Sequence, residues 1–214
     1  IIYSLMVHKP SGILHIASNL GLLYIKNKSY IKNRNAPSGH VSTILFSKKS
    51  RAAFYIVVRN KGLYVTHDSG KSFSKIKSFR AIFAFIHPAH EKHIYLIGER
   101  RAAIMTLNGG KTWKTIRLIP SEGLGRQHKR AIRGKLSAIV FNSRNPNDIA
   151  AFSRAAFWRS KNAGKTFLSS STLFTGFAWS WWNKGAAFDK RNPSRFAFFN
   201  CDVGMTYTKT MGSY

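Results

Sequence analysis

The chain is poor in acidic residues. Its 214 residues include 7 Asp and Glu against 35 Lys and Arg, a formal net charge of +28 with neutral histidine. Such an imbalance says little about the fold, but it favours contact with a polyanion: nucleic acid, anionic lipid, an acidic glycan or the acidic face of a protein. The alternative interpretation is a basic surface that is simply solvated.

Cysteine and long apolar runs are also scarce. Cys201 is the one cysteine, which excludes an intrachain disulfide and a zinc site built from cysteines. No apolar run approaches the length of a membrane span. The histidines are scattered without metal-ligand spacing, apart from a loose HPAHEKH at 87–93. We therefore expect neither a metal site nor a cofactor.

A repeated segment organises the rest of the chain. THDSGKSF at 66–73 returns as TLNGGKTW at 106–113 and as SKNAGKTF at 160–167. These steps of about 40 to 55 residues match the period of propeller blades. A decayed copy, KNKSY, and a terminal copy, TKTMGSY, extend the pattern to five repeats. We place the repeats at 1–39, 40–79, 80–135, 136–184 and 185–214, the last of them incomplete.

The runs between the boxes predict strands. They are short, rich in Ile, Phe, Tyr and Val, and separated by Gly, Pro, Asn and Ser. No stretch keeps a helical period over three turns. We predict an all-β fold, a β-propeller of four-stranded antiparallel blades, with each box as the turn between strands 3 and 4. The start, IIYSLMVHKP, resembles a strand entered midway, so we expect a fragment of a larger propeller.

Each box has the residues that a tight turn needs. An Asp or Asn at its third position can accept hydrogen bonds from backbone amides of its own turn. A glycine falls where a positive φ is expected, and the closing aromatic can anchor the turn between sheets. The residues in these three roles are Asp68, Asn108 and Asn162; Gly70, Gly110 and Gly164; and Phe73, Trp113 and Phe167.

The boxes resemble the Asp-box, or BNR, repeat S-x-D-x-G-x-T-W of sialidases, sortilin-type receptors and xyloglucanase-like propellers. The Asn-Pro turns and the apolar strand that follows them are most similar to the xyloglucanase-like and sortilin branch. The resemblance implies that the box is a structural turn on the face opposite the ligand. It also favours an extracellular or virion-surface location, although the sequence itself does not determine one.

Two long loops between repeats are the candidate ligand-binding segments on the opposite face. The loop at 118–135 is rich in cations, and the loop at 171–185 carries clustered tryptophans, which stack on sugar rings or bases. The candidate ligand-binding residues are Arg126, His128, Lys129, Arg130 and Arg133, with Trp179, Trp181 and Trp182. The alternatives are a solvated charge run for the first loop and burial between blades for the tryptophans.

A catalytic role needs carboxylates that the chain barely has. Most glycoside hydrolases use two, about 5 to 10 Å apart. The candidates on the ligand face are Glu99, Glu122 and Asp202, of which Asp202 lies in NCDVGMTY, similar to a segment that holds a catalytic Asp in xyloglucanase-like enzymes. The sialidase motif Arg-Ile-Pro has only RLIP at 117–120 as a counterpart, which we interpret as the start of a loop.

The sequence therefore predicts a non-catalytic binding or scaffold propeller. Its expected partner is an anionic glycan or another protein in a larger assembly. A glycoside hydrolase of xyloglucanase-like or sialidase-like type is the first alternative. Binding of nucleic acid or another polyanion is the second, because of the net charge.

Overall fold

A computed structural model of the chain describes residues 1–8, 12–99, 102–120, 136–142, 144–153, 156–169, 183–188, 196–200 and 204–208. Within these ranges the regular elements are strands β1 to β20, and no helix there is long and apolar enough to cross a membrane. The predicted all-β class is therefore confirmed.

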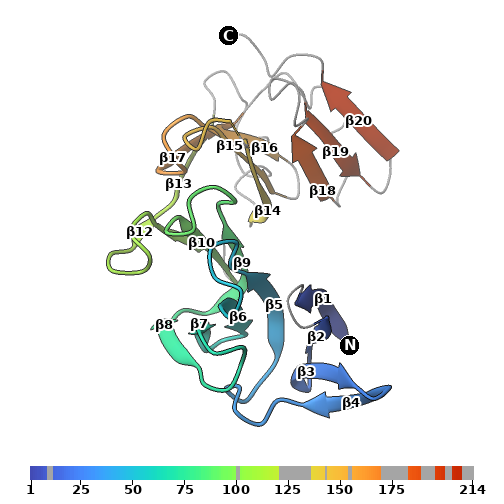
Figure 1. Cartoon of the computed structure of the whole chain (residues 1–214). Coiled ribbons are helices and arrows are strands. Elements are labelled where there is room, and N and C mark those ends of the chain that lie inside the picture. Colours follow the sequence, from blue (N-terminus) through green and yellow to red (C-terminus); the bar gives the residue numbers. More distant parts are fainter. Residues whose placement is uncertain are drawn as a thin grey trace. The chain divides into compact units, whose positions relative to one another are not determined.

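The first two sheets are four-stranded and antiparallel, with their strands side by side in chain order (Figure 1). The first sheet consists of β1 (Ile2–His8), β2 (Ile13–Ser18), β3 (Gly21–Lys26) and β4 (Ser29–Lys32). The second consists of β5 (Val41–Phe46), β6 (Phe54–Val58), β7 (Gly62–Thr66) and β8 (Ser74–Lys77).

The later sheets repeat the same order with small changes. The third consists of β9 (Ala81–Ile86), β10 (Ile94–Gly98), β11 (Ala103–Thr106) and β12 (Lys114–Thr115). The fourth contains β14 (Leu136–Phe141), β15 (Ile149–Ser153), β16 (Ala156–Ser160) and β17 (Thr166–Ser169). The fifth contains β18 (Asn183–Phe188), β19 (Phe196–Asn200) and β20 (Gly204–Thr208). As predicted, the three boxes connect the third and fourth strands of their sheets.

One strand was not predicted from the sequence. RLIP at 117–120 does not simply start a loop, because β13 (Arg117–Ile119) pairs in parallel with β17 and gives the fourth sheet a fifth strand. The Leu118 and Ile119 backbone groups thus cover an edge that would otherwise expose unpaired N–H and C=O groups. A three-residue strand whose partner lies about 50 residues further on leaves no local periodicity to detect.

The chain divides into two compact units. The first contains Ile1–Ile86, Glu91–Glu99 and Thr106–Thr112, and the second contains the rest of the chain. In the first unit a core cluster forms around Phe54, Ile56 and Val58 of β6, with Ala17, Leu22 and Val41 also buried. Each fully buried Ile, Leu or Phe side chain contributes about 1.5 to 3 kcal/mol.

In the second, third and fourth sheets the second strand is buried on both faces. All five residues of β10 and all five of β15 are buried, and β6 is nearly so. Their sequences, IYLIG, IAAFS and FYIVV, are apolar without alternation, which is the pattern of a strand covered on both sides. These continuous apolar runs thus mark strands that have a neighbour on each side within the sheet.

A β-bulge recurs at the same place in all five sheets. The pairing between first and second strand slips by one residue near the start of the first strand. The extra residues are Tyr3, Ser42, Ile82, Ser137 and Lys184. A bulge bends its strand and increases the local twist, so the repeat conserves a backbone shape as well as a sequence motif.

Gly62, at the start of β7, has the least room for a side chain among these strands. Its φ is +125°, and an added Cβ would lie 1.9 Å from the carbonyl oxygen of Lys77. The outer strand β8 can approach β7 here only because the residue is glycine.

Candidate functional site

The box at 66–73 is a closed hydrogen-bonded turn. The hydroxyl of buried Thr66 donates to Asp68 Oδ1 at 2.7 Å and accepts from the amide of Gly70 at 2.9 Å. Asp68 Oδ1 also accepts from the amide of Ser72 at 2.9 Å. The same three bonds recur in the other two boxes. In the second box they join Thr106, Asn108, Gly110 and Thr112, at 2.8, 3.0 and 2.9 Å. In the third box they join Ser160, Asn162, Gly164 and Thr166, at 2.9, 2.9 and 3.0 Å.

The acid of the first box is held by its own turn. The hydroxyls of Ser72 and Thr66, followed by the amide of Ser72, keep the pKa of the Asp68 carboxyl well below its usual range. In the second box an amide replaces the carboxylate. Asn108 Nδ2 donates a hydrogen bond to the Thr112 hydroxyl at 2.8 Å. The Asp or Asn side chain at the third position thus forms its hydrogen bonds within its own eight-residue turn, which is a structural role.

Two successive residues of each box adopt a positive φ. The glycines Gly70, Gly110 and Gly164 lie at +89°, +97° and +80°. The residue before each glycine is positive as well: Ser69 at 60°, Gly109 at 72° and Ala163 at 56°. The decayed box of the first repeat is instead a two-residue hairpin turn, with Asn27 at 50° and Lys28 at 62°.

The closing aromatics anchor the boxes to different depths. Phe167 is fully buried, whereas Phe73 and Trp113 are half-buried. The ring of Phe73 packs edge-on against Phe54, with centroids 5.8 Å apart and planes at 76°. The turn is thereby tied to the core of its sheet.

The remaining described carboxylates also serve local structure. Glu91, in the β9–β10 turn, accepts from the Ser47 hydroxyl at 2.7 Å and from the amides of Lys48 and Lys49 in the β5–β6 turn. Asp148 receives both Nε and Nη2 of Arg159, at 2.9 and 3.0 Å. Such a bidentate pair is among the stronger polar contacts.

Of the three candidate catalytic carboxylates, the structure describes Glu99. It follows β10 and forms an ion pair with Arg59, with Nε and Oε1 3.4 Å apart and both side chains about one-third exposed. Glu122 and Asp202 lie outside the described residues. The same holds for every candidate ligand-binding residue: Arg126, His128, Lys129, Arg130, Arg133, Trp179, Trp181 and Trp182.

The structure instead brings together a pocket that the sequence did not indicate. It encloses about 480 Å³ in the first unit and is lined by strands β2, β3 and β4, the link that follows β4, and the box at 66–73. Its apolar lining comes from Ile13, Tyr24 and Ile31, and its rim carries Lys32, Arg34 and Lys71. No acidic side chain lines it.

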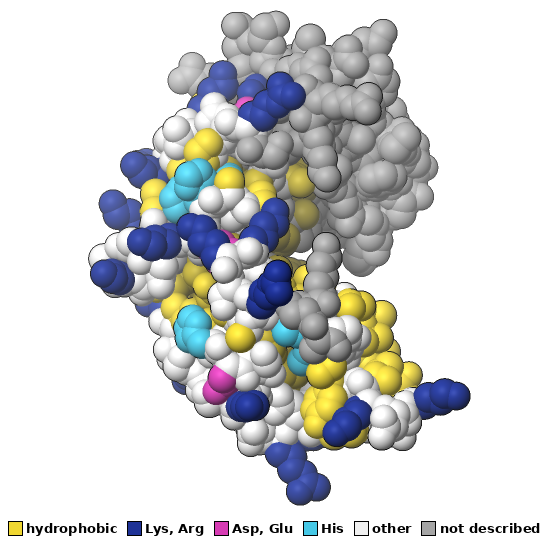
Figure 2. Space-filling view, in the orientation of Figure 1, with side chains coloured by type: hydrophobic (Ala, Val, Ile, Leu, Met, Phe, Trp, Pro, Cys, Tyr) yellow, Lys and Arg dark blue, Asp and Glu magenta, His cyan; other side chains and the backbone are white. Residues whose placement is uncertain are grey.

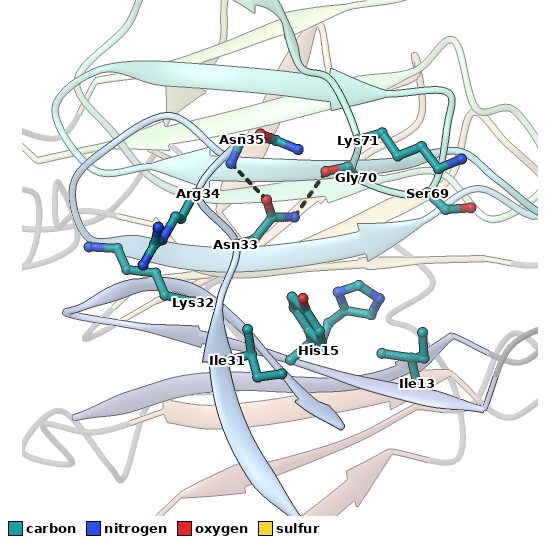
Figure 3. A pocket seen from close by; sticks show the side chains of 11 residues that line it. Ile13, His15, Ile31, Lys32, Asn33, Arg34, Asn35, Ser69, Gly70 and Lys71 are labelled. Carbon is teal, nitrogen blue, oxygen red and sulfur yellow. Dashed lines mark hydrogen bonds between the residues drawn. The ribbon is translucent and has the colours of Figure 1, made fainter. Parts of the chain in front are cut away.

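Asn33 joins the two sides of this pocket (Figure 3). Its Nδ2 donates to the carbonyl of Gly70 at 3.0 Å, while its Oδ1 accepts from the amides of Asn35 and Ala36 at 3.0 and 3.2 Å. We expected the links between repeats to lie on the face away from the boxes. The first link, which follows β4 (Ser29–Lys32), instead contacts a box through Asn33.

His15, on β2, is the most buried polar side chain of the pocket. It is 5% exposed, and its Nδ1 has no hydrogen-bond partner. Burial, and then the nearby His8, lower the pKa of His15 to about 4. Its ring lies among aromatic rings, with centroids 5.1 Å from Phe54 and 5.8 Å from Phe46. The imidazole is therefore neutral at physiological pH.

No signal in the sequence would have found this pocket. His15 sits in the ordinary strand ILHIAS, and KNRN at 32–35 reads as a polar turn. Ser69, Gly70 and Lys71 belong to a box that we interpreted as structural only. The three segments meet through tertiary folding alone.

Four-stranded sheets in chain order with Asp-box turns define a β-propeller of the Asp-box type. The chain belongs to the sortilin family, since the sequence model of "Sortilin, neurotensin receptor 3" matches residues 60–194. The resemblance seen in the boxes is thereby confirmed. A comparison with curated protein sequences gives no match.

Solved propellers share the fold at low sequence identity. The GH74 xyloglucanase from Xanthomonas campestris aligns with a TM-score of 0.72 and 17% identity over 98% of this chain and 36% of the enzyme. YCF48 from Cyanidioschyzon merolae aligns at 0.62 and 11% identity, over 100% of this chain and 68% of that protein. A chain of the nidogen/laminin complex aligns at 0.62 and 6% identity, over 99% and 76%.

These likenesses show the fold alone, because the identities are low. The chain spans about a third of the length of the xyloglucanase that it matches. The structural neighbours include both enzymes and proteins whose names record no catalysis.

Proposed function

We propose that this propeller is a non-catalytic binding or scaffold module whose partner is a polyanion, with an acidic glycan as the first candidate. The observation that carries the proposal is how the scarce carboxylates are used. Asp68 is engaged by its own turn, Glu91 by the neighbouring turn, and Asp148 and Glu99 each by one arginine. With 7 Asp and Glu against 35 Lys and Arg, the acids of the chain can balance only a small part of its positive charge.

The charge distribution supports this proposal. Figure 2 shows Lys and Arg side chains spread over the visible face, with isolated acidic side chains between them. A net charge of +28 raises the local concentration of polyanions and accelerates their association. An acidic glycan or the acidic surface of an assembly partner would neutralise it.

The use of the acids also argues against hydrolysis. A glycosidase needs one carboxylic acid that protonates the leaving group and one carboxylate that acts as nucleophile or base. Glu99, the one candidate acid among the described residues, is already engaged in an ion pair with Arg59. Glu122 and Asp202 stay sequence-based candidates, so the hydrolase alternative stays a prediction.

The names of structural neighbours support a scaffold role as well. One neighbour is YCF48 bound to D1 peptide, and another belongs to the nidogen/laminin complex. Both names record a complex with a protein or a peptide. By this analogy an acidic protein face is the second candidate partner for this chain.

The proposal is tested by measuring binding and turnover on the same substrates. The purified chain is titrated with a sulfated glycan, with single-stranded DNA of similar charge and with neutral xyloglucan, and each mixture is assayed for new reducing ends. We expect the sulfated glycan to bind, with an affinity that falls steeply with salt, and no reducing ends to appear.

Release of reducing ends from xyloglucan would establish the hydrolase alternative instead. Binding of DNA more tightly than the sulfated glycan at equal salt would favour the nucleic-acid alternative. If neither polyanion binds at low salt, the proposed function is wrong.

A further inference from the structure

The cavity at the first box combines an apolar floor, a basic rim and one buried polar atom without a partner. We propose that it binds one acidic sugar unit, a pyranose ring that bears a carboxylate or a sulfate ester. This inference rests on the proposed function, because it assigns a specific subsite to the acidic glycan. The volume of about 480 Å³ lies in the range of small-ligand sites.

Three cations provide the charge that an acidic group needs. Lys32 and Arg34 come from the end of β4 and the link after it, and Lys71 comes from the box. In Figure 3 Lys32 and Arg34 lie together at one end of the pocket, and Lys71 lies at the other. Since no carboxylate lines the pocket, an anion inside it meets no acidic competitor.

His15 provides a buried polar atom beside the pocket, since its side chain is part of the lining and its Nδ1 has no hydrogen-bond partner. A neutral imidazole carries one N–H, so its Nδ1 acts either as a donor or as an acceptor, depending on the tautomer. A sugar acid satisfies both cases, because its hydroxyls donate and its acidic oxygens accept. A bare sulfate ion can only accept a hydrogen bond, and it would leave the apolar lining uncovered.

The apolar lining explains why a ring is expected beside the anionic group. The side chains of Ile13 and Ile31 line the pocket together with the ring of Tyr24, which can pack against the C–H face of a pyranose. This wall is also fixed in place, since Asn33 connects the link after β4 to the box through Gly70. A preformed wall lowers the ordering cost of binding.

The two other intact boxes provide an internal control. Lys71, Lys111 and Lys165 occupy the same position of their boxes, but of these three only Lys71 lines the pocket. Lys71→Gln and Lys111→Gln therefore make the same change of charge in the same kind of turn. A diffuse electrostatic effect would weaken binding equally in both variants.

The experiment titrates the chain with glucuronate, glucose 6-sulfate and neutral glucose, and follows the imidazole nitrogens of His15 by NMR. We expect both acidic sugars to shift the His15 signals and glucose to leave them in place. Lys71→Gln should weaken glucuronate binding by roughly fivefold or more, and Lys111→Gln should leave it unchanged. His15→Phe should abolish the binding of both acidic sugars.

Equal weakening by the two lysine variants would overturn the inference, as would equal binding of glucose or unmoved His15 signals. Binding of the sulfated glycan, measured on the same preparation, distinguishes failure of this subsite from failure of the proposed function. A polymer that binds while the acidic monosaccharides do not leaves the module a polyanion binder and removes the subsite. If neither the polymer nor a monosaccharide binds, both proposals fail.

Discussion

The hydroxyl of Ser42 donates a hydrogen bond to the carbonyl of Ile82, and both residues are the extra residue of a β-bulge. The bond therefore joins the second and third sheets at equivalent points of their first strands. Ser42 is buried, so the bond is shielded from water. The bulge is thus a contact between repeats as well as a bend within each of them.

Removing this hydroxyl tests its contribution to stability. We expect Ser42→Ala to lower the free energy of unfolding by about 1 to 2 kcal/mol, because a buried acceptor loses its donor. The exposed Ser78 provides the control, and Ser78→Ala should change stability by less than about 0.5 kcal/mol. Denaturant unfolding measures both variants. A Ser42→Ala variant as stable as the control would show that the bond is inconsequential.

The boxes differ at the residue before the glycine, and this predicts a stabilising substitution. Ala163 holds a φ of 56°, a region that is unfavourable for a residue with a Cβ, whereas Gly109 holds 72° at the same position. We expect Ala163→Gly to raise the free energy of unfolding, or at least not to lower it, and Gly109→Ala to lower it by about 1 kcal/mol. Thermal unfolding of the two variants gives the signs. A destabilised Ala163→Gly would mean that the lost methyl contacts outweigh the backbone strain.

The acid of the first box should be replaceable by its own amide. Asn108 shows that an amide can accept from the backbone and donate to the next hydroxyl, so Asp68→Asn should be near neutral at pH 7. Asp68→Ala should be clearly destabilising, because the amide of Ser72 loses its acceptor.

The pH dependence distinguishes the two groups at this position. The folded chain holds the pKa of Asp68 below its unfolded value, so the carboxylate contributes stability above the unfolded pKa of about 4. That contribution is lost as the pH falls below this value. The wild type and Asp68→Asn should therefore be similar in stability at pH 7, and the wild type should become the less stable of the two in acid. Parallel stability curves would contradict the assignment.

His15 should make the chain acid-sensitive at a higher pH. Its pKa is about 4 in the folded chain and about 6.5 when unfolded, so the unfolded chain binds the proton first as the pH falls. Stability should decrease from pH 6.5 towards pH 4 with a slope of up to roughly 1.4 kcal/mol per pH unit from this residue.

The variant His15→Phe isolates this slope. It keeps an aromatic ring beside Phe54 and Phe46 but removes the titration. Subtracting its stability curve from that of the wild type should leave a difference that changes between pH 6.5 and 4 and is flat above pH 7.5. A flat difference throughout would mean that His15 is solvated in the folded chain.

The tryptophan loop gives a prediction from sequence alone. If the cluster at 179–182 contacts glycan, Trp181→Ala or Trp182→Ala should abolish binding on a glycan array and leave the melting temperature nearly unchanged. If the cluster is buried between blades, the same variants should melt several degrees lower and still bind. Measuring both quantities on one preparation separates the two interpretations.

Much of the fold could be predicted because its signals are local. The glycine and the Asp or Asn of each box lie within eight residues, and continuous apolar runs such as IYLIG mark the central strands. The bulges and β13 could not be predicted, since both depend on a partner strand. Ser42 is recognised as a bulge residue only from the pairing of its strand with β6. Leu118 is recognised as a strand residue only from its pairing with β17.

The sequence by itself determined the class of the protein: the repeat, the strand order within each sheet, the position of the boxes and a large excess of positive charge. Only the tertiary structure decided what those residues meet. It paired Asp148 with Arg159 and Glu99 with Arg59, and it placed His15, Asn33 and Lys71 around one cavity. The physical reason is distance along the chain. Turns and strands depend on neighbours a few residues away, whereas a pocket forms where segments tens of residues apart pack together.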